Sequence, residues 1–121
     1  MKINGRERHF ELNVQAHKEI AEQLPGHDFA ALGEMYKGGS MQTVDTDIMV
    51  AIALNRGYED HRHFEDPSYT PVYLTEDDFR FLPIETITAL EQELLAVITQ
   101  DKQQEIETEV PNAKKAGEVK E

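Results

Sequence analysis

The amino-acid sequence predicts a mainly α-helical domain of the α+β type, in which an N-terminal β-hairpin packs on a small bundle of about five helices and a disordered acidic tail follows. Three observations lead to this prediction. An Asn-Gly pair stands near the start, apolar residues recur at helical spacing along most of the chain, and the apolar stripe fades after Gln100. The 121 residues suffice for one hydrophobic core, and we expect a single compact domain over residues 1–104.

The hairpin is predicted over residues 1–12 from its turn. Both central positions of the favoured two-residue turn need a positive φ, which Asn4-Gly5 tolerates. This turn places Ile3 opposite Arg6. Alternation then puts one set of apolar residues on a common face: Met1, Ile3, Phe10 and Leu12. Because an isolated hairpin is marginally stable in water, we expect this face to pack on the helices.

Capping residues and breakers mark the first three helices. Asn13 caps a helix over about residues 14–24, and Asp28 caps a second over about 28–37, which ends at Gly38-Gly39. The expected apolar sides are Val14, His17, Ile20, Ala21 and Leu24 in the first helix, and Phe29, Leu32, Met35 and Tyr36 in the second. A third helix, about 44–56, contains an apolar run over 48–54 that predicts burial all round, and Gly57 is expected just past its end.

A long polar and aromatic loop is expected from Tyr58 to Leu74. Thr75 and the acids after it predict a short helix over about 75–82, which Pro83 ends and whose apolar residues are Phe79, Phe81 and Leu82. The last helix, about 84–104, has the clearest stripe: Ile84, Ile87, Leu90, Leu94, Val97 and Ile98. It should fray near 105–110, with disorder from Pro111 onward, so residues 105–121 are expected to form a flexible charged tail.

Composition excludes several classes of function. The absence of cysteine excludes a disulfide scaffold, a thiolate zinc site, an iron–sulfur cluster and a cysteine nucleophile. With 12 basic and 24 acidic residues the formal charge is -12, so binding to nucleic acid or to an anionic membrane lacks its electrostatic source. The longest apolar run is far shorter than a bilayer span. We therefore expect a soluble cytoplasmic protein without nucleic-acid or membrane partners.

The residues that could take part in catalysis or metal binding are more typical of structural roles in this sequence. His61 and His63, with carboxylates nearby, would lie on one side of an extended segment and could hold a divalent metal ion, but paired histidines in a solvated acidic loop seldom do. His17 is expected to be a partly buried structural histidine, and Glu91 to lie at the edge of the last stripe. No phosphate loop, nucleophile elbow or dinucleotide fingerprint occurs. We predict no enzyme activity, no cofactor and no catalytic, cofactor-binding or metal-binding residues.

The order of features resembles a known family. The segments that carry the resemblance are Met1-Lys2-Ile3-Asn4-Gly5-Arg6, Phe10-Glu11-Leu12-Asn13, Asp28-Phe29-Ala30-Ala31-Leu32, Leu74-Thr75-Glu76-Asp77-Asp78-Phe79, and the long helix from Ile84 with its Glu- and Lys-rich tail. Together they look like a tail assembly chaperone of bacteriophages of the siphophage and prophage type. The resemblance implies a non-catalytic protein of the bacterial cytoplasm that binds and solubilises the tape measure protein, helps recruit tail tube protein, and is absent from the mature virion. It also implies that residues 101–121 could link to a second domain in a frameshifted longer form.

Aromatic residues of the expected loop are the candidate partner-binding residues: Tyr58, Phe64, Tyr69 and Tyr73. They could instead cover the buried third helix, or mediate a homo-oligomer. Two other functions stay open: a small acidic intracellular regulator, such as an antitoxin, anti-repressor or DNA mimic that binds a basic partner, and a small metal-dependent enzyme that uses His61 and His63.

Overall fold

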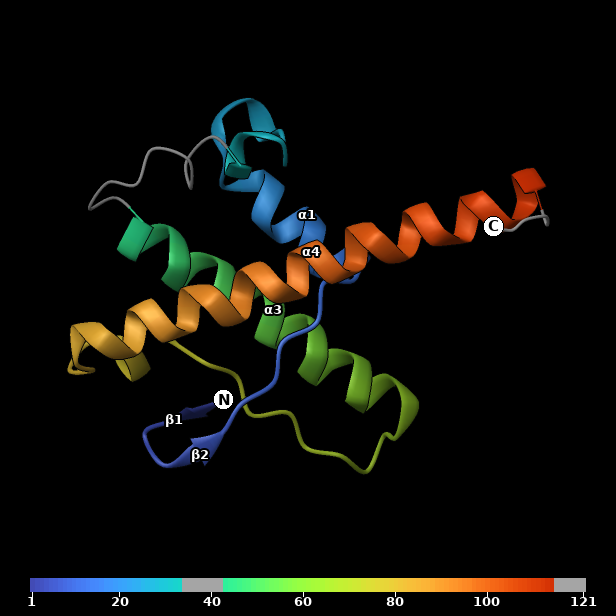
Figure 1. Cartoon of the computed structure of the whole chain (residues 1–121). Coiled ribbons are helices and arrows are strands. Elements are labelled where there is room, and N and C mark those ends of the chain that lie inside the picture. Colours follow the sequence, from blue (N-terminus) through green and yellow to red (C-terminus); the bar gives the residue numbers. More distant parts are fainter. Residues whose placement is uncertain (34–42, 115–121) are drawn as a thin grey trace.

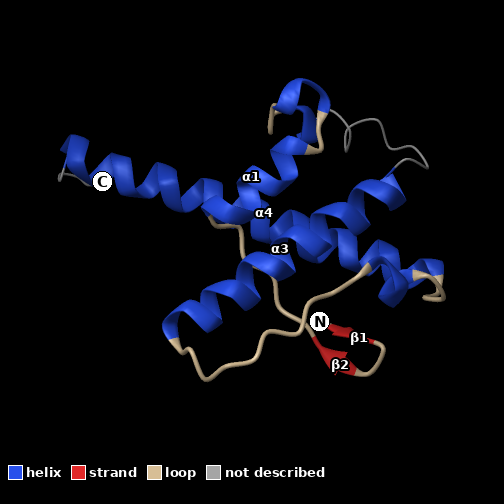
Figure 2. Ribbon diagram, turned by 180° about the vertical axis from the view of Figure 1, so that it is seen from behind, coloured by secondary structure: helices blue, strands red, loops and turns tan. Residues whose placement is uncertain are grey.

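The computed structural model describes residues 1–33 and 43–114, and the side chains of residues 1–33 and 44–99. It shows a mainly helical domain with an N-terminal hairpin, as predicted (Figures 1 and 2). The described elements are strands β1 (Lys2–Ile3) and β2 (Arg6–Glu7), helices α1 (Val14–Glu22), α3 (Thr43–Glu65) and α4 (Ile84–Lys114), and the 3₁₀ helices η1 (Pro25–His27) and η2 (Glu76–Phe79).

Helix α3 lies at the centre of the fold and packs against both α1 and α4. In Figure 1, α4 crosses α3, and its red C-terminal end extends away from the other elements. Strand β1, the helices α1, α3 and α4, η2 and some connecting segments contribute to one core, whose buried members are Ile3, Ala16, Ile20, Leu24, Leu32, Val50, Ala51, Ala53, Leu54, Leu74, Phe79, Ile87, Leu90 and Leu94. Among the described residues, no helix is both long and apolar enough to cross a membrane.

The hairpin has the predicted turn and register. Asn4 and Gly5 have φ values of 53° and 80°, and Ile3 pairs with Arg6. Its strands have two residues each and are therefore much shorter than the predicted 1–12 hairpin. Phe10 and Leu12 lie in the irregular segment that follows and are half-buried against the core, as predicted.

Helix α1 begins as predicted but buries a different stripe. The Asn13 side chain accepts a hydrogen bond from the backbone N–H of Ala16 at 3.0 Å, which confirms the cap. Ala16, Ile20 and Leu24 are buried, whereas Val14 is 78% exposed. His17 is also exposed rather than partly buried, and its ring stacks on Phe29 at 4.2 Å between centroids. The buried i, i+4, i+8 row shares Ile20 and Leu24 with the predicted stripe but contains Ala16 in place of Val14 and His17.

Only the start of the second predicted helix, 28–37, lies within the described residues. The Asp28 carboxylate accepts a hydrogen bond from the Ala30 N–H at 3.0 Å, and the backbone is helical at residues 31–33. Phe29 is half-buried and Leu32 is buried, as expected. Met35, Tyr36 and Gly38-Gly39 lie outside the described residues.

Helix α3 does not end near Arg56, as the sequence predicts, but continues to Glu65. The predicted loop from Tyr58 to Leu74 therefore begins only at residue 66. Gly57 is a buried residue in the middle of the helix, where its lack of a side chain serves packing rather than helix termination. The helix ends just before Pro67, because a following proline disfavours helical backbone.

The predicted burial of α3 on all sides is also wrong. Val50, Ala51, Ala53 and Leu54 are buried, whereas three apolar residues of the run are only half-buried: Ile48, Met49 and Ile52. Sequence cannot show that the neighbouring elements cover only part of the circumference of α3.

The predicted helix at 75–82 is reduced to the four residues of η2, where the Thr75 N–H donates to the Asp78 carboxylate at 2.8 Å. Helix α4 continues to Lys114, past the predicted end at residue 104 and past the fraying expected at 105–110. Residues 105–114 of the predicted tail, Pro111 included, are thus helical. Residues 115–121 lie outside the described part.

The apolar stripe of α4 is largely as predicted. Ile87, Leu90 and Leu94 are buried, and Val97 and Ile98 are half-buried. Ile84, by contrast, is 65% exposed, because it lies at the open start of the helix. Glu91 is half-buried beside the stripe, as expected.

We predict that Gly57→Ala destabilises the protein. The added Cβ would lie 2.8 Å from Asn13 Oδ1, 3.1 Å from the Ala16 Cβ and 3.1 Å from the Glu11 carbonyl oxygen, and overpacking of this kind costs about 1–3 kcal/mol. Gly33→Ala is the matched control, because no atom of residues 1–33 or 43–114 lies within 4 Å of its new Cβ and alanine favours helix. Urea unfolding should show a loss for Gly57→Ala and none for Gly33→Ala; equal stabilities would contradict the packing role of Gly57.

Candidate functional site

A groove of about 790 Å³ runs between the N-terminal half of α3, η2 and the start of α4. Apolar residues form most of its wall: Val44, Ile48, Met49, Ile52, Phe79, Leu82, Ile84 and Ile87. The polar residues in its lining are Gln23, Asp45, Thr46, Glu76 and Arg80. The three half-buried residues of the α3 run belong to this wall. The groove is therefore the part of the apolar surface of α3 that the other described elements leave accessible.

Two exposed apolar side chains extend this surface where η2 leads into α4. Phe81 is 87% exposed and lies in the chain between Arg80 and Leu82, which both line the groove. Ile84 lines the groove and is itself largely exposed. The sequence prediction assigned both residues to the apolar sides of helices. The shortness of η2 and the position of Pro83 leave them uncovered, and no sequence signal distinguishes them from core residues.

The predicted partner-binding residues do not form one exposed patch. Tyr58 is a residue of α3, and its ring centroid lies 4.9 Å from that of His9. The hydroxyls of Tyr69 and Tyr73 donate to Glu59 and Asp60 of the same helix. Tyr69 and Tyr73 therefore cover α3, the alternative that the sequence left open. Binding of a partner by them stays a prediction.

Phe64 differs from the tyrosines. It is 84% exposed near the C-terminal end of α3 and lines a second cavity of about 460 Å³, together with residues of the segment that precedes α1. Of the predicted contact residues it is the most exposed, since Tyr73 is 38% exposed and Tyr58 and Tyr69 are half-buried.

Two buried polar residues of α3 hold the flanking segments in place. The Asn55 side chain donates to the His9 carbonyl at 3.1 Å and accepts from the Leu74 N–H at 2.8 Å. One turn later, the Glu59 carboxylate accepts from the Tyr69 hydroxyl at 2.7 Å and from the Val72 N–H at 3.1 Å. The charge of Glu59 raises the pKa of the Tyr69 hydroxyl, chiefly through this hydrogen bond. Both residues were missed by sequence reasoning, although they follow Ala51 at four-residue intervals and so share its buried face.

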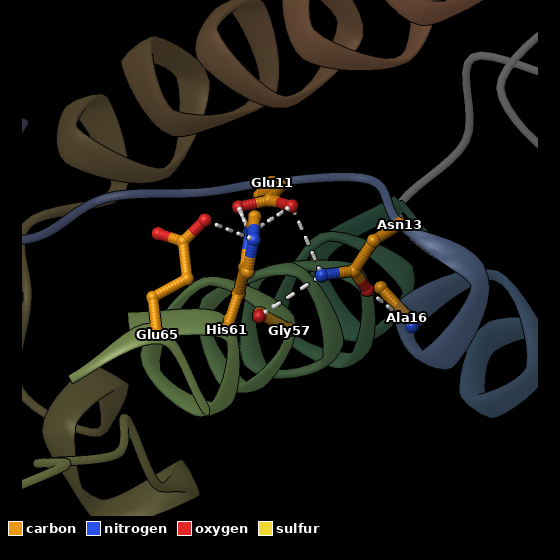
Figure 3. A network of polar contacts seen from close by, with 6 residues as sticks. All are labelled: Glu11, Asn13, Ala16, Gly57, His61 and Glu65. Carbon is orange, nitrogen blue, oxygen red and sulfur yellow. Dashed lines mark hydrogen bonds and ion pairs between the residues drawn. The ribbon is translucent and has the colours of Figure 1, made fainter. Parts of the chain in front are cut away.

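His61 lies in a network of polar contacts between α3 and the segment before α1 (Figure 3). Its Nδ1 is 2.8 Å from Glu11 Oε2, and its Nε2 is 3.2 Å from Glu65 Oε2. The Glu11 carboxylate also accepts a hydrogen bond from Asn13, whose amide donates to the Gly57 carbonyl at 3.0 Å. The hydrogen bond to Glu11, followed by the charges of Glu11 and Glu65, raises the pKa of His61.

The two histidines do not converge on a common point. Because α3 continues through this segment, His61 and His63 lie two helical positions, about 200°, apart instead of on one side of an extended chain. His63 contacts the Tyr69 carbonyl at 2.8 Å through its Nδ1. Among the described residues, no group of three or more His, Asp or Glu side chains is placed to hold a metal ion.

Comparison of the chain with protein-family models, with curated proteins and with solved structures finds no match.

We predict that Asn55→Ala lowers the free energy of unfolding by about 2–4 kcal/mol, because it leaves the His9 carbonyl and the Leu74 N–H without their buried partner. Gln15→Ala is the control, since Gln15 of α1 makes an exposed hydrogen bond to Asp60, which lies on α3 as Asn55 does. Chemical denaturation should show a change near zero for the control. A similarly small effect for Asn55→Ala would show that water replaces the amide.

We also predict that His61 titrates above the ordinary imidazole pKa of about 6.5. A raised folded-state pKa means that protonated His61 stabilises the fold below the unfolded pKa, and this contribution is lost as the pH rises through the folded pKa. The stability difference between the unmodified protein and His61→Gln should therefore be largest below the unfolded pKa of about 6.5 and shrink as the pH rises above it. NMR titration of the imidazole should show a larger fall in pKa with Glu11→Gln than with Glu65→Gln; the opposite order would contradict the assignment.

Proposed function

We propose that the protein is a phage tail assembly chaperone that binds amphipathic helical segments of the tape measure protein, keeps that protein soluble and helps recruit tail tube protein. The observation that carries the proposal is the apolar groove between α3, η2 and α4, with Phe81 and Ile84 exposed beside it. The layout of sequence segments that resembles this family adds support. The proposed site of action is the bacterial cytoplasm during assembly, with no place in the finished virion.

An amphipathic client helix suits this groove physically. Such helices lay their apolar side chains into a hydrophobic groove on the receptor, and two walls of this groove are themselves helical. Burial of client surface also removes Phe81 and Ile84 from water, which favours binding by about 25 cal/mol per Å² of apolar area. The apolar wall of the groove therefore favours the binding of a client helix, and this binding involves no chemical reaction.

Charge around the groove indicates the type of client helix. Asp45 and Glu76 line it, while Arg80, the one basic residue among the described lining residues, lies 3.5 Å from Asp77. With a formal charge of -12 the chain attracts basic flanks and stays soluble when its client is not. We therefore expect the bound segments to carry Lys or Arg beside their apolar stripe. The acidic charge alone would equally suit a regulator with a basic partner, and the groove is what favours the chaperone.

Phe81→Ser tests this proposal, since Phe81 is too exposed for its loss to disturb the core. In co-expression with the tape measure protein of the same phage or prophage, we expect the unmodified chain to raise the soluble fraction of the client and Phe81→Ser to lose most of that gain. Soluble client is measured after centrifugation, with equal expression of both chains verified.

Phe64→Ser is the matched control, because it removes an equally exposed ring at the other end of α3. It should leave client solubility unchanged. Loss of activity with Phe64→Ser alone would move the binding surface to the predicted aromatic patch and exclude the groove. If the unmodified chain does not solubilise the tape measure protein, the chaperone proposal is wrong.

A further inference from the structure

The inner face of the hairpin contains a buried arginine. Ile3 and Arg6 are cross-strand partners and so share one face, and alternation returns Arg8 to that face two residues later. Because this face packs on the domain, Ile3 is buried and Arg8 is only 5% exposed. The position of Arg8 is fixed through its backbone, whose N–H donates to the Met1 carbonyl at 2.8 Å.

The guanidinium of Arg8 has no hydrogen bond or ion pair with any side chain or backbone group of the described residues. An arginine carries five N–H donors and a permanent positive charge, and the removal of both from water is costly unless they are paired. In the described part of the chain, the buried Arg8 guanidinium therefore lacks a negatively charged hydrogen-bond acceptor, which would offset its removal from water.

A cavity of about 180 Å³ lies beside this arginine, between the hairpin and the segment that leads into η2. Its lining residues are Ile3, Asn4, Arg6, Arg8, Val72, Tyr73, Leu74 and Asp78. Arg6 is exposed and brings a second positive charge to the cavity. The volume is below the roughly 300–1,000 Å³ of most small-molecule pockets, so a single ionic group fits better than a whole cofactor.

The acidic side chains of Glu7, which precedes Arg8 in the chain, and Asp78, which lines the cavity, have other partners. The Glu7 carboxylate pairs with the amino group of Met1 at 2.7 Å. The Asp78 carboxylate accepts from the Thr75 N–H at 2.8 Å and lies at the start of η2. The Asn4 side chain donates to the Asp78 carbonyl at 2.8 Å, which holds the hairpin over the cavity.

We propose that this cavity binds an oxyanion group, a carboxylate or a phosphate, through the Arg8 guanidinium with Arg6 as the second cation. The planar fork of Arg8 matches two oxygens of either group. The overall negative charge of the chain repels free anions at long range, so recognition depends on these two arginines.

The test is a titration of the unmodified protein with sodium phosphate or sodium acetate against sodium chloride at equal ionic strength. The NMR signal of the Arg8 side-chain Nε–H should move and saturate with at least one of the two oxyanions, and the thermal midpoint should rise with its concentration. Saturation with phosphate alone, acetate alone or both identifies the class of group. If the Arg8 signal moves with neither, the proposal is wrong.

Phosphate stabilises most proteins without binding them, so a matched pair of variants separates the two effects. Arg8→Gln should lose the saturable part of the rise in midpoint. Lys2→Gln removes one charge from the exposed face of the same hairpin and should keep it. Equal losses in both variants would show a general charge effect and overturn the site. Should Arg8→Gln fail to fold, the NMR titration of the unmodified chain decides.

Discussion

The close approach of the segment before α1 to helix α3 is the constraint on which the rest of the structure depends. At Gly57 the two backbones come so near that a Cβ atom would collide with Asn13 and with the Glu11 carbonyl. Asn13 makes two hydrogen bonds at this point. Its side-chain N–H donates to the Gly57 carbonyl, and its side-chain oxygen accepts from the Ala16 N–H and so caps α1. The direction of α1, and with it the position of Ile20 in the core, follows from this contact.

Further hydrogen bonds from α3 extend the same arrangement on both sides. The Glu11 N–H donates to the Leu54 carbonyl at 3.1 Å. The Asn55 side chain is hydrogen-bonded both to the His9 carbonyl and to the Leu74 N–H, and so joins the two segments that contain them. Since Leu74 lies just before η2, this buried amide connects the segment after the hairpin to the segment that leads into η2. Buried polar groups of this kind fix the relative positions of the segments that they join, because the fold loses stability when a buried hydrogen bond is broken.

The two proposed binding surfaces lie on either side of η2. Asp78 lines the cavity of Arg8, and its neighbour Phe79 lines the apolar groove. Asn4 connects the hairpin to η2 through the Asp78 carbonyl. The groove suits the apolar face of an amphipathic helix, whereas the cavity suits an oxyanion. The two surfaces therefore differ in chemistry although they meet at neighbouring residues of η2.

Several features follow from sequence alone because they depend on neighbouring residues. The Asn4-Gly5 turn, the register of Ile3 with Arg6, the Asn13 cap and the buried residues Leu90 and Leu94 were all predictable from local chemistry and periodicity. The mainly helical class follows in the same way. Tertiary structure alone decided that Gly57 lies inside a helix, that Phe81 remains exposed, and that Arg8 is buried. Glycine, phenylalanine and arginine take these roles only through what packs beside them, and those neighbours are distant in the chain, beyond the reach of any local pattern.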